Sequence, residues 1–84
     1  MNYNTIKFEI FLSEPLLLDL KNSIFKFLSE YDDNINFNFF KDYYKDCFKL
    51  EFLCNKDYAF EIISIIKNFS KEVKIQFNIL PIIN

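Results

Sequence analysis

Apolar and polar residues alternate most clearly in Ile6-Lys7-Phe8-Glu9-Ile10-Phe11-Leu12. Neighbouring side chains of a β-strand point to opposite faces, so this pattern predicts a strand with one apolar face and one face in water. The same alternation occurs in residues 35–40, 47–53 and 73–80. The chain therefore contains four predicted strands, whose Ile, Val and Phe content is typical of a sheet with one exposed face.

Two long segments have a different period. Residues 14–31 and 56–70 are predicted helices, because their apolar residues recur every three or four positions. These residues are Leu17, Leu20, Ile24, Phe27, Leu28 and Tyr31 in the first segment and Ala59, Ile62, Ile63, Ile66 and Phe69 in the second. Ser13 and Asn55 precede the helices as candidate N-caps, and Pro15 stands in a first turn that needs no N–H donor.

The two halves of the chain repeat each other. Residues 6–11 align with residues 48–53, and residues 35–40 align with residues 75–80. The order βαββαβ resembles the ferredoxin-like fold, in which a split βαβ unit occurs twice. The resemblance implies one α+β domain over residues 1–84, with a four-stranded antiparallel sheet in the order 4-1-3-2 and both helices on one face. The expected core side chains of the sheet are Phe8, Ile10, Phe37, Leu50, Phe52, Ile75 and Phe77, beneath both helical stripes.

Charges support the antiparallel pairing of the first and third strands. With Phe8 opposite Leu50, Lys7 faces Glu51 and Glu9 faces Lys49, whereas parallel pairing would set like charges side by side. Each opposite pair across two strands stabilises a sheet by about 0.2–1 kcal/mol. We therefore predict the antiparallel register with Phe8 opposite Leu50.

The composition excludes several kinds of chemistry. The chain has no His, Gly, Arg or Trp, so it lacks histidine catalysis, arginine contacts with phosphate and glycine-rich phosphate loops. Asn, Ile, Lys and Phe make up 44 of the 84 residues, and their A- and T-rich codons indicate an AT-rich genome. Apolar runs are far shorter than a membrane span requires, so no membrane partner is expected.

Neither the cysteines nor the acidic residues form a catalytic or metal-binding pattern. Cys47 and Cys54 lie on opposite faces of one predicted strand and cannot bond to each other. Unpaired thiols are typical of a reducing compartment, which predicts a cytoplasmic location. The acidic residues around the end of the first helix are those of an ordinary turn. We expect no enzyme activity, no metal and no cofactor.

Nucleic acid is a disfavoured partner, although RNA-recognition motifs share this topology. Such motifs stack bases on exposed aromatic residues of the first and third strands. Here Lys49 and Glu51 occupy the exposed positions of the third strand, and the net charge is −2. The chain therefore lacks both the stacking surface and the basic surface of an RNA-binding module.

Exposed aromatic residues are the candidate protein contact. The predicted register sets Phe11, Phe40 and Cys47 side by side on the exposed face, next to a loop with Tyr43 and Tyr44. Exposed Tyr and Phe surrounded by charges are typical of protein interfaces. The second candidate surface is the acidic group Glu30, Asp32 and Asp33.

The leading hypothesis is a small non-enzymatic protein-binding domain, whose partner is a large host complex or a second copy in a homodimer. One form of it is an adaptor or inhibitor encoded by a phage or mobile element that blocks a partner surface. Anti-CRISPR proteins are similar in size and in lacking catalytic groups, although no motif matches them. The alternative is a small-molecule-sensing regulatory domain, like the ferredoxin-like domains that bind amino acids at paired sheet edges. Asn34 or Asn55 would then replace the glycines common at such sites.

Overall fold

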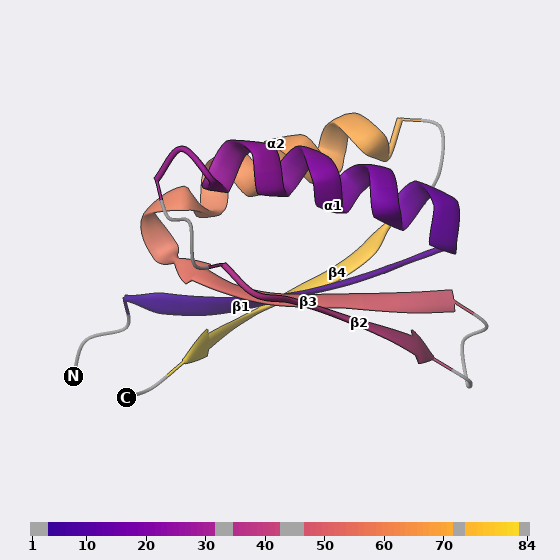
Figure 1. Ribbon diagram of the computed structural model, residues 1–84, viewed down its shortest axis with the longest axis horizontal. Coiled ribbons are helices and arrows are strands. Elements are labelled where there is room, and N and C mark those ends of the chain that lie inside the picture. The colour runs from indigo at the N-terminus through magenta and orange to yellow at the C-terminus, as the bar shows by residue number, and fades with distance from the viewer. Residues whose placement is uncertain (1–3, 32–34, 43–46, 72–73, 83–84) are drawn as a thin grey trace.

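The computed structural model describes residues 4–31, 35–42, 47–71 and 74–82. The elements are β1 (Thr5–Leu12), α1 (Glu14–Leu28), β2 (Phe37–Asp42), β3 (Cys47–Asn55), the 3-10 helix η1 (Lys56–Tyr58), α2 (Ala59–Phe69) and β4 (Gln76–Ile82). The strands form one antiparallel sheet in the order β2-β3-β1-β4, and both helices cover the same face (Figure 1). The ferredoxin-like fold and the sheet order are thus as predicted.

α1 differs from its predicted length at one end and α2 at both, since α2 spans Ala59–Phe69 against the predicted residues 56–70. α1 ends at Leu28 and not at Tyr31, and the hydroxyl of Ser29 donates to the carbonyl oxygen of Lys26 at 3.1 Å. A serine that satisfies a carbonyl of the last turn in this way replaces the bond that further helix would provide. α2 begins late because the preceding residues form η1, which Asn55 caps by accepting a hydrogen bond from the Asp57 N–H at 2.9 Å.

The strands β2 and β4 begin later than their alternation predicts, at Phe37 instead of residue 35 and at Gln76 instead of residue 73. β2, β3 and β4 also run past their predicted ends at residues 40, 53 and 80, to Asp42, Asn55 and Ile82. The pairing partner sets these limits, since β2 joins the sheet where Phe37 meets Phe52 and β4 where Gln76 meets Phe11. The apolar–polar alternation of the sequence extends beyond the residues that have a partner on a neighbouring strand, but the strand is limited to those residues.

The core lies between the helices and the apolar face of the two central strands. Its fully buried residues are Phe8, Ile10, Leu50 and Phe52 from the sheet and Leu17, Leu20, Ile24, Leu28, Ile62 and Ile66 from the helices. The predicted core residues Phe37, Ile75, Phe77 and Phe69 are only partly buried. The first three lie on or beside the edge strands, whereas α1 packs on β1 and β3, so the centre of the sheet is covered best.

The register between β1 and β3 corrects the prediction. Phe8 lies opposite Phe52 and not Leu50, and the two rings stack with centroids 5.2 Å apart and planes 10° from parallel. Such aromatic pairs contribute about 0.5–1.5 kcal/mol beyond the burial of their area. Each side chain keeps its predicted face, because the shift preserves the period of two.

Candidate functional site on the open face of the sheet

The face of the sheet turned away from the helices is called here the open face. Across the strands from β2 to β4, its central row is Asn38, Glu51, Glu9 and Asn78. The row on one side is Phe40, Lys49, Phe11 and Gln76, and the row on the other side contains Leu53, Lys7 and Leu80. In each outer row a lysine of a central strand lies between two apolar residues, as the internal repeat of the sequence requires.

The predicted contact residues Phe11 and Phe40 share a row, with Lys49 between them. Cys47, the third residue of the predicted group, lies outside this row. The Lys49 Nζ is 5.3 Å from the centre of the Phe40 ring, a distance typical of a cation–π contact. Cys47 lies opposite Asp42 at the start of β3, because the corrected register moves it away from Phe11. Phe40 is 46% exposed, whereas Phe11 is half-buried.

Of the remaining predicted contact residues, the structure describes Glu30 alone. Tyr43, Tyr44, Asp32 and Asp33 lie outside the part of the chain that the structure describes. Glu30 is exposed in the turn after α1, so it does not belong to the open face.

Neither cysteine forms a disulfide, and the two thiols differ in environment. Cys47 is half-buried, whereas Cys54 is 4% exposed on the core face. Burial raises the pKa of the Cys54 thiol to about 11, so Cys54 is a neutral core residue at physiological pH.

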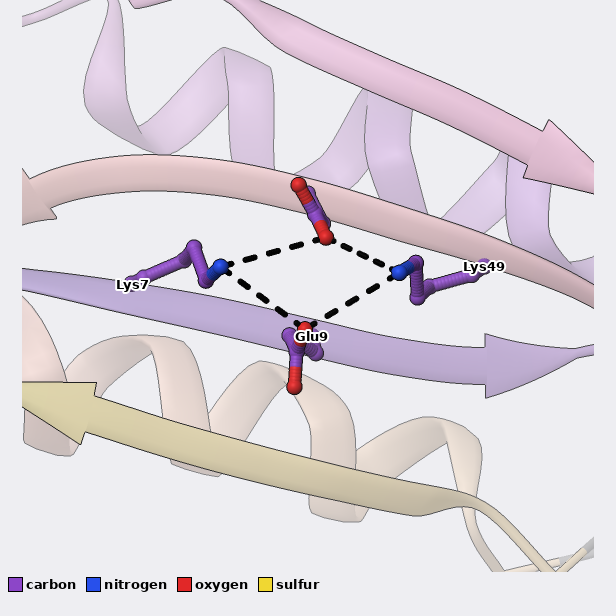
Figure 2. Close-up of polar contacts among 4 residues, drawn as sticks. Lys7, Glu9 and Lys49 are labelled. Atoms are coloured by element: carbon purple, nitrogen blue, oxygen red, sulfur yellow. Dashed lines mark ion pairs between the residues drawn. The ribbon is translucent and has the colours of Figure 1, made fainter.

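Four charged side chains meet at the centre of the open face (Figure 2) and are called here the charge tetrad. They are Lys7, Glu9, Lys49 and Glu51. The Nζ–Oε2 distances are 3.8 Å for Lys7–Glu9, 4.0 Å for Lys7–Glu51, 3.9 Å for Lys49–Glu9 and 3.0 Å for Lys49–Glu51. The signs alternate around the tetrad, so each charge has two neighbours of opposite sign.

The tetrad explains why the register shift does not lose ion pairs. Glu9 lies directly opposite Glu51, an arrangement that by itself destabilises a sheet. Lys7 and Lys49 lie on the two diagonals, and each reaches both carboxylates. The shifted register therefore gains the aromatic stack in the core and keeps all the opposite-charge contacts on the open face.

Glu51 is held in its ionised form. A hydrogen bond from Lys49 lowers the pKa of its carboxyl group from the ordinary 4.5, and the charges of Lys49 and Lys7 act in the same direction against partial desolvation. A carboxylate with a lowered pKa accepts hydrogen bonds and pairs with cations at neutral pH, but it does not deliver protons. At neutral pH the Glu51 carboxylate is therefore suited to pairing with cations and not to general acid catalysis.

A hollow of about 560 Å³ opens beside the tetrad, where β3 runs past the start of β2. Its lining residues are Thr5, Lys7, Ile35, Asn36, Asn38, Glu51, Phe52, Leu53, Cys54 and Asn55. Alternate residues of a strand point to opposite faces, so consecutive residues share a hollow only along the edge of their strand. Residues 52–55 therefore present the edge of β3, which has no described strand beside it after Phe52 on the β2 side.

Sequence reasoning found parts of this site and missed others. The motif Lys-x-Glu occurs in both central strands, at residues 7–9 and 49–51, and this repeat was the available signal for the tetrad. Of the two asparagines considered for a ligand, Asn55 lines the hollow, and Asn34 lies outside the described residues. The sequence carries no signal for the hollow itself, because the hollow exists only where β2 and β3 part.

Two kinds of site find no support within the described part of the chain. No three His, Cys, Asp or Glu side chains gather there as a metal site needs. Neither α1 nor α2, the two α-helices described, has the length and apolar character of a membrane span.

Comparison with solved structures identifies several chains with the same fold. A DUF3240 family protein from Shewanella baltica OS155 is similar with a TM-score of 0.75 at 10% identity, over 100% of this chain and 94% of that one. A functionally unknown protein from Pediococcus pentosaceus ATCC 25745 gives 0.62 at 11% identity, over 99% and 96% of the two chains. These identities establish a shared fold alone.

A third similar structure is the regulatory subunit of aspartate kinase from Thermus thermophilus in its ligand-free form. Its TM-score is 0.57 at 14% identity, and the match covers 95% of this chain and 53% of that one. The chain thus spans about half the length of that subunit. No known protein family and no curated protein matches the sequence.

Proposed function

We propose that this protein is a non-enzymatic regulatory domain that binds a small polar molecule in the hollow beside the charge tetrad. The observation that carries the proposal is the hollow itself. Its volume, about 560 Å³, lies within the roughly 300–1,000 Å³ of typical small-molecule sites. The two free cysteines of the protein, Cys47 and Cys54, are compatible with the reducing cytoplasm, where we propose that the domain acts.

The lining combines the groups that a zwitterionic ligand requires. Lys7 donates to a carboxylate, and Glu51, which stays ionised, accepts from an ammonium group. The amides of Asn36 and Asn38 add donors and acceptors, and Leu53 supplies apolar contact. A free amino acid carries both charged groups on one carbon atom and is the ligand class that fits this lining best.

The fold comparison supports a regulatory role by analogy. One of the similar structures is the regulatory subunit of an enzyme. The same fold hosts many unrelated functions, so the hollow and its lining carry the argument.

A thermal-shift experiment with the individual amino acids tests the proposal. At a hundredfold excess over its Kd, a ligand of the folded state stabilises it by about 2.7 kcal/mol, which raises Tm on the order of 10 °C. We expect one or a few related amino acids to produce such a shift, and the others not. A panel without any shift would contradict the proposal.

A pair of matched variants locates the site. Asn38→Phe fills the hollow, whereas Asn78→Phe places the same ring at the equivalent position of the opposite edge strand. We expect the shift to disappear in Asn38→Phe and to persist in Asn78→Phe. If both variants keep the shift, the ligand binds elsewhere.

A protein-binding adaptor or inhibitor is the second candidate function. The observation in its favour is the exposure of Phe40, Leu53 and Leu80 on the open face, at 46%, 47% and 39%. Affinity purification with the wild-type domain and with Phe40→Ala tests it. A host complex that is retained by the wild type and lost with Phe40→Ala would support this function, and equal retention would exclude Phe40 from the contact.

A further inference from the structure

The apolar residues of the open face surround a charge pattern that is complementary to itself. We propose that the open face binds the open face of a second copy, with the strands of the two sheets crossing at about 90°. The inference rests on the tetrad and on the positions of the apolar residues around it, and it holds whether or not the hollow binds a ligand.

The charge pattern selects the crossing angle. Lys7 and Lys49 are separated along the strands (Figure 2), whereas Glu9 lies directly across from Glu51 on the neighbouring strand. Sheets pack face to face either nearly aligned, at about 30°, or orthogonally, at about 90°. In the aligned packing the glutamates of one copy face those of the other. A quarter turn exchanges the positions of the two signs, so each lysine faces a glutamate of the second copy.

The apolar residues favour the same angle. Phe40 on β2 and Leu80 on β4 lie at diagonally opposite corners of the face. Two copies that cross at about 90° are related by a twofold axis along a diagonal of the face, so Phe40 meets either Phe40 or Leu80 of the second copy. In the aligned packing with the axis along the strands, Phe40 would instead meet the polar Gln76.

The desolvation of the tetrad does not oppose this contact strongly. Its side chains are only 30% (Lys7), 17% (Glu9), 27% (Lys49) and 18% (Glu51) exposed, so folding of the monomer has already removed most of their water. The cluster carries no net charge, and the second copy offers each member a further opposite charge. The main gain in association comes from Phe40, Leu53 and Leu80, which lose the water that now covers them.

Sedimentation velocity of the purified protein is the first test. We expect a dimer of twice the chain mass of 10.2 kDa, with a Kd at least about thirtyfold higher for the double variant Phe40→Ser, Leu80→Ser. Phe60→Ser is the matched control, since Phe60 is 81% exposed on α2, away from the open face. A monomeric wild type, or a dimer that Phe60→Ser weakens equally, would overturn the proposal.

The second test exchanges the signs of the tetrad. The variant Lys7→Glu, Glu9→Lys, Lys49→Glu, Glu51→Lys keeps the net charge and retains an alternating tetrad within its own chain. With crossed sheets we expect it to dimerise with itself and to form no mixed dimers with the wild type, which native mass spectrometry of the mixture would show. Mixed dimers in statistical proportion would indicate an edge-to-edge contact, and preferred mixed dimers would indicate aligned sheets. Either result would refute the crossed arrangement. A different protein bound to the open face in place of a second copy would refute it as well.

Discussion

At the scale of single residues, Glu51 connects the electrostatics of the open face to stability. Its pKa is lowered in the folded state, so the unfolded chain binds a proton more readily as the pH falls. The stabilisation from the ionised carboxylate is therefore present above about pH 4.5 and is lost as the pH falls through the lower folded pKa. The ion pairs of Glu51 thus contribute to stability at neutral pH and not in acid.

This linkage predicts a pH-dependent difference between the wild type and Glu51→Gln. We expect the variant to be less stable at pH 7, and the difference to shrink as the pH is lowered below about 4.5, because the wild-type carboxylate is then neutral too. Urea denaturation at several pH values measures both proteins. A difference that stays constant down to pH 2 would show that the charge of Glu51 does not stabilise the fold.

Phe52 tests the packing at the centre of the core. It is 1% exposed and contacts two rings, Phe8 at 5.2 Å and Phe37 at 5.0 Å between centroids. We expect Phe52→Ala to lower the free energy of unfolding by about 3–5 kcal/mol, because the lost ring leaves a cavity. The exposed Phe60 provides the control, and Phe60→Ala should change stability by no more than about 0.5 kcal/mol. A loss below about 1 kcal/mol for Phe52→Ala in denaturant titration would contradict the central position of this ring.

At the scale of elements, the junction between β3 and α2 depends on one side chain. Asn55 ends β3, lines the hollow and caps η1 through the hydrogen bond that it accepts from the Asp57 N–H. A single residue thus ends a strand, starts a helix and contributes to the candidate binding site. Asn is suited to all three roles, because its short amide bonds to the adjacent backbone.

Removal of this cap should therefore affect stability. We expect Asn55→Ala to lower the free energy of unfolding by about 1 kcal/mol, the usual effect of a lost N-cap. Asn38→Ala serves as the comparison, since Asn38 is an exposed lining residue of the same hollow but caps no helix. Equal losses in the two variants by thermal or urea unfolding would argue against the capping role.

At the scale of the whole molecule, the ligand hollow and the proposed dimer share two residues. Lys7 and Glu51 line the hollow and are also half of the tetrad. A ligand that pairs with them withdraws one charge of each sign from the pattern that the second copy meets. Binding of the ligand and association of the two copies would then be coupled, and the coupling would act equally in both directions.

This coupling predicts that the amino acid identified by thermal shift weakens the dimer. We expect the dimer Kd to rise as the ligand is added in sedimentation experiments. Asn38→Phe, with its filled hollow, should show no such rise. An unchanged dimer Kd for the wild type at saturating ligand would show that ligand binding and dimerisation are not coupled.

The sequence by itself determined the fold class, the sheet order and the face on which each strand residue lies. The faces follow from the period of two, which survives the register shift that moved Phe52 opposite Phe8. The sheet order followed from the resemblance of the βαββαβ order to the ferredoxin-like fold. Tertiary structure alone decided the register and the hollow, whereas the early end of α1 coincides with the local bond from Ser29 to the Lys26 carbonyl oxygen. The charges in the sequence favoured Leu50 as the partner of Phe8 by about 0.2–1 kcal/mol for each opposite pair, but packing in the core and the diagonal reach of the lysines outweighed this preference. The hollow depends on where β2 leaves β3, and that point is set by contacts between residues far apart in the chain.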